Sequence, residues 1–143
     1  MADKNIDKKK VLATLDRILE AELAGVVRYT HYSFMIFGYS RIPVISWFES
    51  QANESLAHAR QVGEMITHLG GEPSLAIGKL LDRHDYDMSE ILRKCLEHER
   101  SAQALYRKLL SQTDVSTHRF GVETRRSFQP QSGGHCLRLI NES

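Results

Sequence analysis

The sequence predicts an all-α protein built from three long amphipathic helices. In three runs, apolar residues recur at steps of three and four with charged residues between them, the pattern of a helix with one buried face. One short link and one long link separate the runs, and this pair of link lengths is informative about their arrangement. No segment shows a persuasive strand pattern, so we expect a helical bundle.

The first helix is expected from Asp7 to about Phe37, which is unusually long for a globular protein. Gly38 should end it, because glycine is favoured directly after a helix. Its apolar stripe contains Val11, Leu15, Ile18, Val26 and Tyr29.

The second helix is expected to begin near Ser40 and Pro43, which are typical of a turn followed by a helix start. It should end at Leu69, where the segment 70–73 (Gly-Gly-Glu-Pro) combines a C-terminal cap with a helix breaker. Its apolar stripe contains Val44, Phe48, Ala52, Ala59, Val62 and Ile66.

The third helix is expected to begin at Asp87, since Asp87 and Glu90 have the spacing of a capping box. Its apolar residues continue to Leu109. They include Ile91, Leu92, Cys95, Leu96, Ala102, Leu105 and Tyr106.

The link lengths predict how the helices are arranged. A first link of about five residues makes the first two helices an antiparallel hairpin. The second link, from Gly70 to Tyr86, reaches about 55 Å when extended, and a helix of roughly 26 residues is about 39 Å long. It can therefore cross the whole bundle and make the second and third helices parallel, as in four-helix bundles with a long crossover.

The composition changes after Leu110. Alanine, methionine and lysine are all absent from residues 111–143, and no helical apolar stripe continues there. We therefore expect a helical domain over residues 1–110 and an irregular tail over 111–143. The fourth helix of the bundle is expected to be missing or degenerate.

Composition excludes several classes of function. The 143 residues carry 19 Lys and Arg against 18 Asp and Glu, so bulk charge gives no reason to expect nucleic acid or a membrane surface as a partner. No apolar stretch is long enough for a membrane span. Cys95 and Cys136 form no CxxC pair, which favours a reducing cytoplasm over an oxidising compartment.

Two carboxylates occupy positions where apolar residues are expected. Glu22 lies in the apolar stripe of the first helix and Glu99 in that of the third. A buried, unpaired carboxylate costs several kcal/mol, so each requires a compensating partner. Taken singly, each can also be a boundary residue that meets an arginine or reaches solvent, but two on facing helices favour a shared site.

The second helix adds Glu54 and His58, which are four residues apart and can converge on one point. An ordinary surface pair is an equally good interpretation, and Glu64 with His68 repeats the spacing. Carboxylates with an imidazole are ligands suited to iron, manganese or zinc. The remaining histidines have no partner at ligand spacing and are expected to be exposed: His31, His84, His98, His118 and His135.

At these residues the sequence resembles the bacterioferritin branch of the ferritin-like proteins. The matching segments are LEAELA (19–24) followed by Tyr29, ESLAHA (54–59), LGGEP (69–73), and ERSA with LYR (99–107). The resemblance covers about residues 7–110. No single segment identifies the family, but the four segments together do.

The resemblance implies a di-iron ferroxidase site in a four-helix subunit, with iron as the cofactor and the stored cargo. Its implied metal ligands are Glu22, Glu54, His58 and Glu99, with Tyr29 next to them. It also implies a homo-oligomer that encloses iron in a hollow shell.

The chain departs from the family at three positions. If His58 takes the family's histidine position, the partnering glutamate position holds Ser55, and Glu54 is one residue away. The haem-ligand methionine of haem-binding members is Leu56, so haem is not expected. The fourth-helix Glu-x-x-His has no counterpart, since neither Glu123 nor Glu142 is followed by histidine three residues later.

Three functions therefore compete. The first is iron binding and storage with Fe(II) oxidation, a ferroxidase-type activity impaired by the lost ligands. The second is a structural bundle or shell subunit with a degenerate site. The third is a DNA-protecting miniferritin, which would require a basic tail and ligands at a subunit interface that the sequence does not show.

Overall fold

The computed structural model describes residues 7–39, 41–80 and 86–113. These residues form three α-helices and no strand: α1 (Lys8–Met35), α2 (Arg41–His68) and α3 (Met88–Thr113). The predicted all-α class and the three long helices are confirmed. Residues 111–113 complete α3, and the rest of the tail, with the question of a fourth helix, lies outside the described residues.

Each helix end has a local cause in the sequence. Asp7 caps α1, because its carboxylate accepts a hydrogen bond from the Lys10 backbone N–H at 3.2 Å. After α2, Gly70 adopts a positive φ of 74°, and the Gly71 N–H donates to the Ile66 carbonyl at 2.9 Å. With the Gly70 N–H bonded to the Thr67 carbonyl, this is the glycine cap expected from the sequence.

The start of α3 is capped by the aspartate expected from the sequence. The Asp87 carboxylate accepts a hydrogen bond from the Ser89 N–H at 3.1 Å. The Glu90 carboxylate binds the Arg93 guanidinium at 2.5 and 2.9 Å, a charge-assisted pair within the first turns of the helix.

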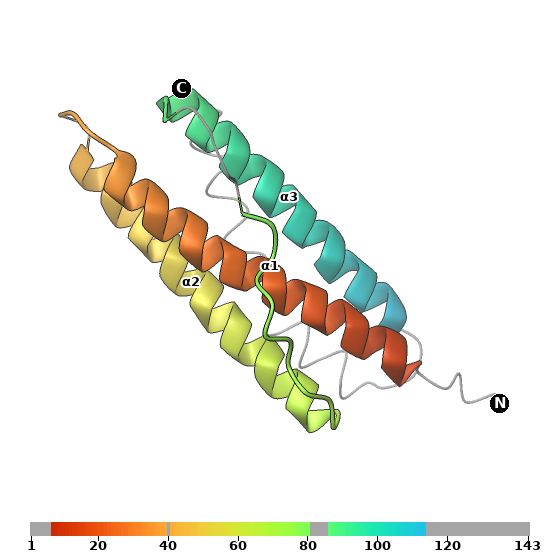
Figure 1. Cartoon of the computed structure of the whole chain (residues 1–143). Coiled ribbons are helices and arrows are strands. Elements are labelled where there is room, and N and C mark those ends of the chain that lie inside the picture. Colours follow the sequence, from red (N-terminus) through yellow and green to blue (C-terminus); the bar gives the residue numbers. More distant parts are fainter. Residues whose placement is uncertain (1–6, 40, 81–85, 114–143) are drawn as a thin grey trace.

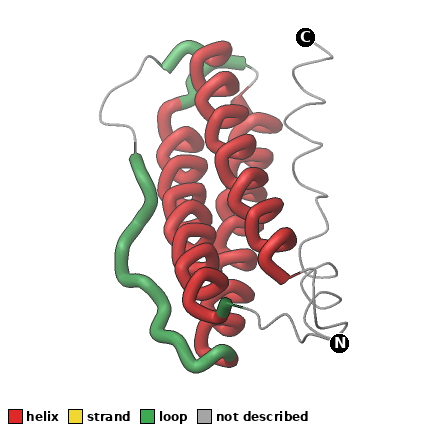
Figure 2. The backbone as a smooth tube through the Cα atoms, turned by 90° about the vertical axis from the view of Figure 1, so that its right-hand side faces the viewer, coloured by secondary structure: helices red, strands yellow, loops and turns green. Residues whose placement is uncertain are grey.

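The helices have the expected arrangement. In Figure 1, α1 and α2 run antiparallel as a hairpin, α3 lies against α1, and α2 and α3 point the same way. The connection after α2 runs along the bundle as an extended segment, which Figure 2 shows as a green tube beside the helices. The long crossover between the second and third helices is therefore confirmed.

The crossover is pinned to the outer side of α1 by polar contacts. The Ser74 hydroxyl donates to the Glu20 carboxylate at 2.7 Å, and the Gly78 N–H donates to the Glu20 carbonyl at 2.8 Å. Further along, the Arg28 guanidinium donates to the Lys79 carbonyl at 2.6 Å. Gly78 is required here, because a Cβ would lie 2.8 Å from the Glu20 carbonyl oxygen.

The core consists of two apolar clusters along the bundle axis. One joins the first half of α1 to the second half of α2: Val11, Leu15, Ile18, Leu19, Ala59, Val62 and Ile66, with Leu109. The other surrounds the hairpin half: Tyr29, Tyr32, Ile36, Phe48, Ala52, Ile91 and Cys95. Between them, each helix contributes polar residues, and these form the candidate site.

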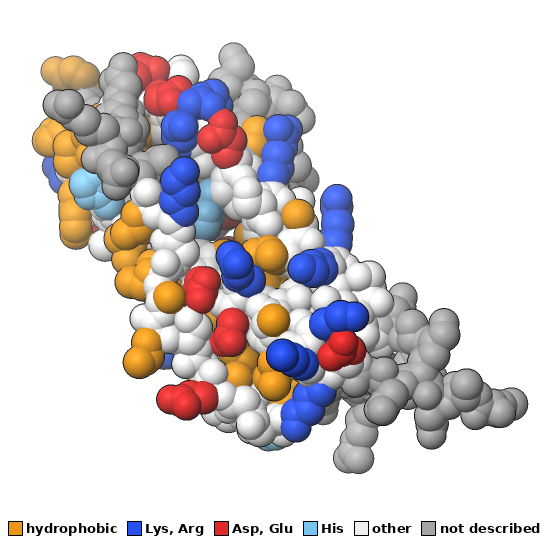
Figure 3. All heavy atoms as spheres, turned by 45° about the vertical axis from the view of Figure 1, so that its right-hand side comes forward, with side chains coloured by type: hydrophobic (Ala, Val, Ile, Leu, Met, Phe, Trp, Pro, Cys, Tyr) orange, Lys and Arg blue, Asp and Glu red, His pale blue; other side chains and the backbone are white. Residues whose placement is uncertain are grey.

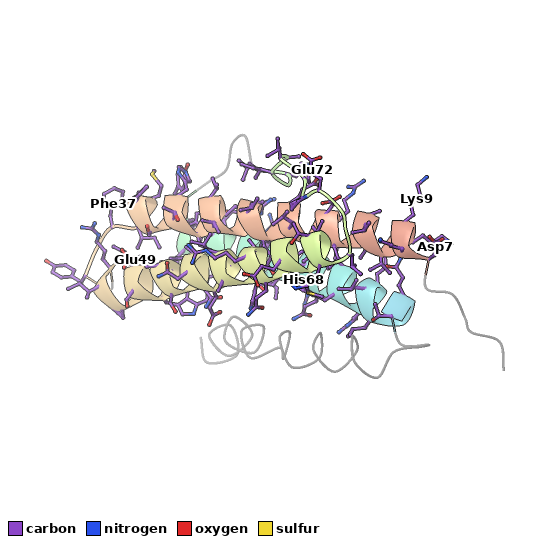
Figure 4. All side chains as sticks on the ribbon, turned by 90° about the horizontal axis from the view of Figure 1, so that it is seen from below. Asp7, Lys9, Phe37, Glu49, His68 and Glu72 are labelled. Atoms are coloured by element: carbon purple, nitrogen blue, oxygen red, sulfur yellow. The ribbon has the colours of Figure 1, made fainter. Side chains whose placement is uncertain are left out.

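The surface carries mixed charges and some exposed apolar side chains. Lys, Arg, Asp and Glu side chains are interspersed on the face shown in Figure 3. Phe37 projects at the hairpin end of the bundle and Lys9 lies at the opposite end (Figure 4). Among the described helices, none is long and apolar enough to cross a membrane.

Candidate metal centre

Glu22 lies inside the bundle between the two apolar clusters, with 7% of its surface exposed. Its carboxylate accepts a hydrogen bond from the Tyr106 hydroxyl of α3. The Nδ1 atom of His58, from α2, lies 3.4 Å from the same carboxylate oxygen. Glu22 therefore joins all three helices.

Glu99 faces the same interior from α3 and accepts a hydrogen bond from the Tyr29 hydroxyl of α1. Burial raises the pKa of the Glu99 carboxyl, and the Tyr29 hydrogen bond opposes this rise. The two glutamates are thus linked by a reciprocal pair of tyrosine bonds, α1 to α3 and α3 to α1. The structure brings Glu22, Glu99 and His58 together, with Tyr29 beside them.

Tyr106 is a site residue that the sequence reasoning did not single out. A signal for it was present, because Tyr106 follows Glu99 by seven residues just as Tyr29 follows Glu22 by seven. Two helical turns separate each pair, so tyrosine and glutamate share one helix face. Burial and the charge of Glu22 raise the pKa of the Tyr106 hydroxyl, which keeps it a hydrogen-bond donor.

On α2, the two expected ligands lie differently. His58 is half-buried, and its hydrogen bond with Glu22 raises its pKa, while burial opposes that rise. Glu54 is exposed, and its carboxylate lies 3.4 Å from the Gln51 side-chain nitrogen. The buried position nearest to it is Ser55, one residue further along α2.

Ser55 and His98 meet at the backbone of α1 next to the site. A Cβ on Gly25 would lie 2.7 Å from the Ser55 hydroxyl oxygen and 3.1 Å from His98 Nε2. The His98 ring lies edge-on to Tyr29, with ring centroids 6.2 Å apart. Burial lowers the pKa of His98 to about 4, so the imidazole is neutral near pH 7.

The expectation that His98 is solvent-exposed is therefore wrong. Residues 91, 95, 102, 105 and 109 form the α3 stripe that packs on α1, and position 98 continues that stripe at helical spacing. The imidazole is largely buried because Gly25 leaves room for it.

Of the other histidines, the structure describes His31 and His68, and both lie on the surface outside the candidate site. His31 is exposed as expected, and its Nε2 lies 2.7 Å from the Tyr86 hydroxyl. His68 is exposed, and its Nδ1 lies 2.9 Å from the backbone carbonyl of Glu64 rather than its carboxylate. The remaining three, His84, His118 and His135, lie outside the described residues.

Comparison with known proteins identifies the family and the fold of the chain. Residues 12–118 match the ferritin-like domain family, which is most of the chain. The chain belongs to this family. The ferritin-like assignment made from its motifs is thereby confirmed, while the narrower bacterioferritin branch is not decided by this match.

A solved structure shows the same ferritin-like fold. It is a ferritin-like, diiron-carboxylate protein from Bacillus anthracis str. Ames, with a TM-score of 0.82 and 22% sequence identity. The alignment covers 98% of this chain and 99% of the other. No curated protein sequence matches the chain.

The donor types of this ferritin-like site suit ferrous iron, since carboxylate and imidazole ligands bind iron, manganese and zinc. As the side chains lie, however, no three His, Cys, Asp or Glu side chains within the described residues form a group that could hold a metal ion. Glu22 and Glu99 instead accept the tyrosine hydroxyls. These residues fit an ion only if the carboxylate and imidazole donors move closer together than they lie here.

Proposed function

We propose that this ferritin-like protein binds ferrous iron at Glu22, Glu99 and His58 and oxidises it slowly. The observation that supports this is the placement of two carboxylates, from α1 and α3, inside the bundle. Within the described part of the chain, neither forms an ion pair with a lysine or arginine. A divalent cation would offset both charges, and the family supplies iron as the candidate.

The chain's own residues have separate roles in this proposal. Glu22 and Glu99 provide oxygen donors from facing helices, and His58 provides a nitrogen donor. Because its pKa is raised by Glu22, His58 tends to hold a proton that must leave before the nitrogen can bind a metal. Glu54 is the remaining candidate ligand and would have to turn inward from the surface. Iron is the substrate, and each ferrous ion gives one electron to dioxygen or peroxide.

Oxidation is proposed to be slow because donors are missing. Ser55 takes the place where the bacterioferritin resemblance puts a helix-two glutamate, and the sequence contains no fourth-helix Glu-x-x-His. Loss of a residue that merely supports a ligand typically costs about 10–100-fold in metal affinity or activity, and loss of a direct ligand should cost at least as much. Storage in a homo-oligomeric shell belongs to the same proposal and depends on assembly of the bundle.

The test is an anaerobic titration with Fe(II), followed by exposure to air. We expect measurable binding to the wild-type chain, abolished in Glu22→Ala and Glu99→Ala. Glu49→Ala, which removes an exposed carboxylate of α2, is the matched control and should bind normally. Oxidation should be well below the rate of a complete bacterioferritin subunit. Unchanged binding in both site variants would contradict the site, and full activity would contradict the impairment.

A purely structural role is the second candidate, and one observation favours it. The reciprocal bonds from Tyr29 and Tyr106 give both carboxylates a hydrogen-bond donor without any metal. In that case the polar layer only joins α1 to α3. A wild-type chain that binds no Fe(II) in the titration would select this function.

A further inference from the structure

We infer that this site holds one metal ion per chain and not a bridged pair. The inference rests on the proposed function, because it assumes that Glu22, Glu99 and His58 bind ferrous iron. It goes further by fixing the number of ions from the charge and the space that the described residues provide.

The charge at the site balances one divalent cation. Glu22 and Glu99 carry two negative charges when ionised, and a neutral His58 adds none. One ferrous ion therefore leaves the buried site neutral. A second would leave two positive charges uncompensated in the interior, which costs several kcal/mol per ion or more. Glu54 does not change this balance as it lies, because its side chain is exposed.

The donor set also falls short of a pair. Bundle-core di-metal sites use one Glu from each of two helices and a Glu-x-x-His from each of the other two. On α2, the position of that glutamate, three residues before His58, holds Ser55. The described residues thus give the two single carboxylates and one histidine, and the carboxylate that would bridge from α2 is replaced by a hydroxyl.

The space beside Gly25, one turn after Glu22 on α1, is already filled. This glycine is approached by the Ser55 hydroxyl from α2 and by the His98 imidazole from α3. The clearance is so small that a methyl group on Gly25 would meet both side chains. Side chains from α2 and α3 therefore occupy the volume beside this turn of α1, which leaves less room near the site for a second ion.

The experiment measures the number of ions bound per full-length chain. It uses anaerobic equilibrium dialysis followed by metal analysis, with Fe(II) and then Co(II) as probes. The number of ions bound by Glu22→Ala is subtracted from the number bound by the wild-type chain, so that ions bound at the surface are not counted. One ion per chain is the expected result. Two would overturn the inference while leaving the proposed function intact, and none would overturn both.

A gain-of-ligand variant tests the role of Ser55. Ser55→Glu should raise the number of ions above one, because it returns a carboxylate to the interior at the spacing of the di-metal pattern. Ser50→Glu, at an exposed position of α2, is the matched control and should stay at one. A folded Ser55→Glu protein that still holds one ion would overturn the assignment of Ser55. If Ser55→Glu does not fold, the number of ions bound by the wild-type chain decides whether the site holds one ion or two.

Discussion

At the scale of single residues, the site is defined by two carboxylates that each accept a hydrogen bond from a tyrosine on the other helix. Tyr29 donates to Glu99, and Tyr106 donates to Glu22. Such bonds to charged acceptors are stronger than neutral ones, and a buried carboxylate without its donor bears the full desolvation penalty. The tyrosines therefore stabilise the metal-free bundle.

Removal of either hydroxyl should weaken the metal-free protein. We expect Tyr29→Phe and Tyr106→Phe each to lower the free energy of unfolding by about 1–3 kcal/mol, measured by urea unfolding without metal. Tyr39→Phe, at a fully exposed position, should have no effect. Equal stability of the three variants would show that the hydroxyls do not support the carboxylates.

His98 should make stability fall in mild acid. Burial lowers its pKa to about 4 from an ordinary 6.5. The unfolded chain therefore takes up this proton first, and stability is lost as the pH falls from about 6.5 towards 4. The loss at pH 5 should be on the order of 1–2 kcal/mol.

The difference between variants isolates this effect from other titrating groups. Urea midpoints at pH 7 and pH 5 should differ less for His98→Gln than for the wild type. His68→Gln, at an exposed position, should keep the wild-type pH dependence. Identical pH dependence in all three proteins would mean that His98 is not held neutral.

The inward placement of Glu22 and Glu99 could be predicted because each interrupts an apolar stripe, and hydrophobic periodicity identifies the buried face of a long helix. Their role as metal ligands stays a prediction. His58 was predicted only as part of a pair with Glu54. In the structure Glu54 is exposed, and its neighbour Ser55 is buried instead. Adjacent helix positions differ by about 100° in direction, and the choice between Glu54 and Ser55 depends on packing against α1 that periodicity does not specify.

At the scale of elements, the sequence specified the helices well because their ends carry strong local signals. The Asp7 cap, the Gly70 cap and the Asp87 cap lie where they were expected. The last helix extends to Thr113, a few residues beyond the expected Leu109, and the buried Thr113 hydroxyl donates to the Leu109 carbonyl at 3.1 Å. The contacts that fix the crossover on α1 were not predicted, because they join residues more than fifty positions apart.

The crossover offers a test at this scale through Gly78. An alanine there would place its Cβ 2.8 Å from the Glu20 carbonyl oxygen and 3.1 Å from the Glu20 carbonyl carbon, both backbone atoms that cannot swing away. We expect Gly78→Ala to lower the free energy of unfolding by about 1–3 kcal/mol.

Gly63→Ala is the matched control. A Cβ at that position in α2 meets nothing within 4 Å, and alanine is the better helix former. This variant should be more stable by about 0.5–1 kcal/mol. If both substitutions have the same sign, the crossover is not held against α1 as described.

At the scale of the whole molecule, the bundle is two apolar cores with a polar layer between them. Both cores are built on the α1–α2 hairpin, and α3 adds residues to each. Apolar side chains also remain at the surface: Phe34, Leu75 and Ile77 are 67%, 99% and 52% exposed. We propose that these side chains belong to an association surface, since contiguous apolar surface favours association with other molecules.

We therefore expect the chain to self-associate, in keeping with the proposed homo-oligomer. Sedimentation should show a mass above that of one chain that rises with concentration. Phe34→Ser combined with Leu75→Ser should shift the protein towards the single chain, because it removes apolar surface that association would bury. A wild-type chain of single mass at all concentrations would contradict this expectation.

The most direct test of the metal site is anomalous X-ray diffraction, at the iron absorption edge, from crystals grown anaerobically with Fe(II). We predict one anomalous peak per chain, in contact with the Glu22 and Glu99 carboxylates and the His58 ring. An iron peak elsewhere in the chain, with Glu22 and Glu99 still bound to Tyr106 and Tyr29, would contradict it.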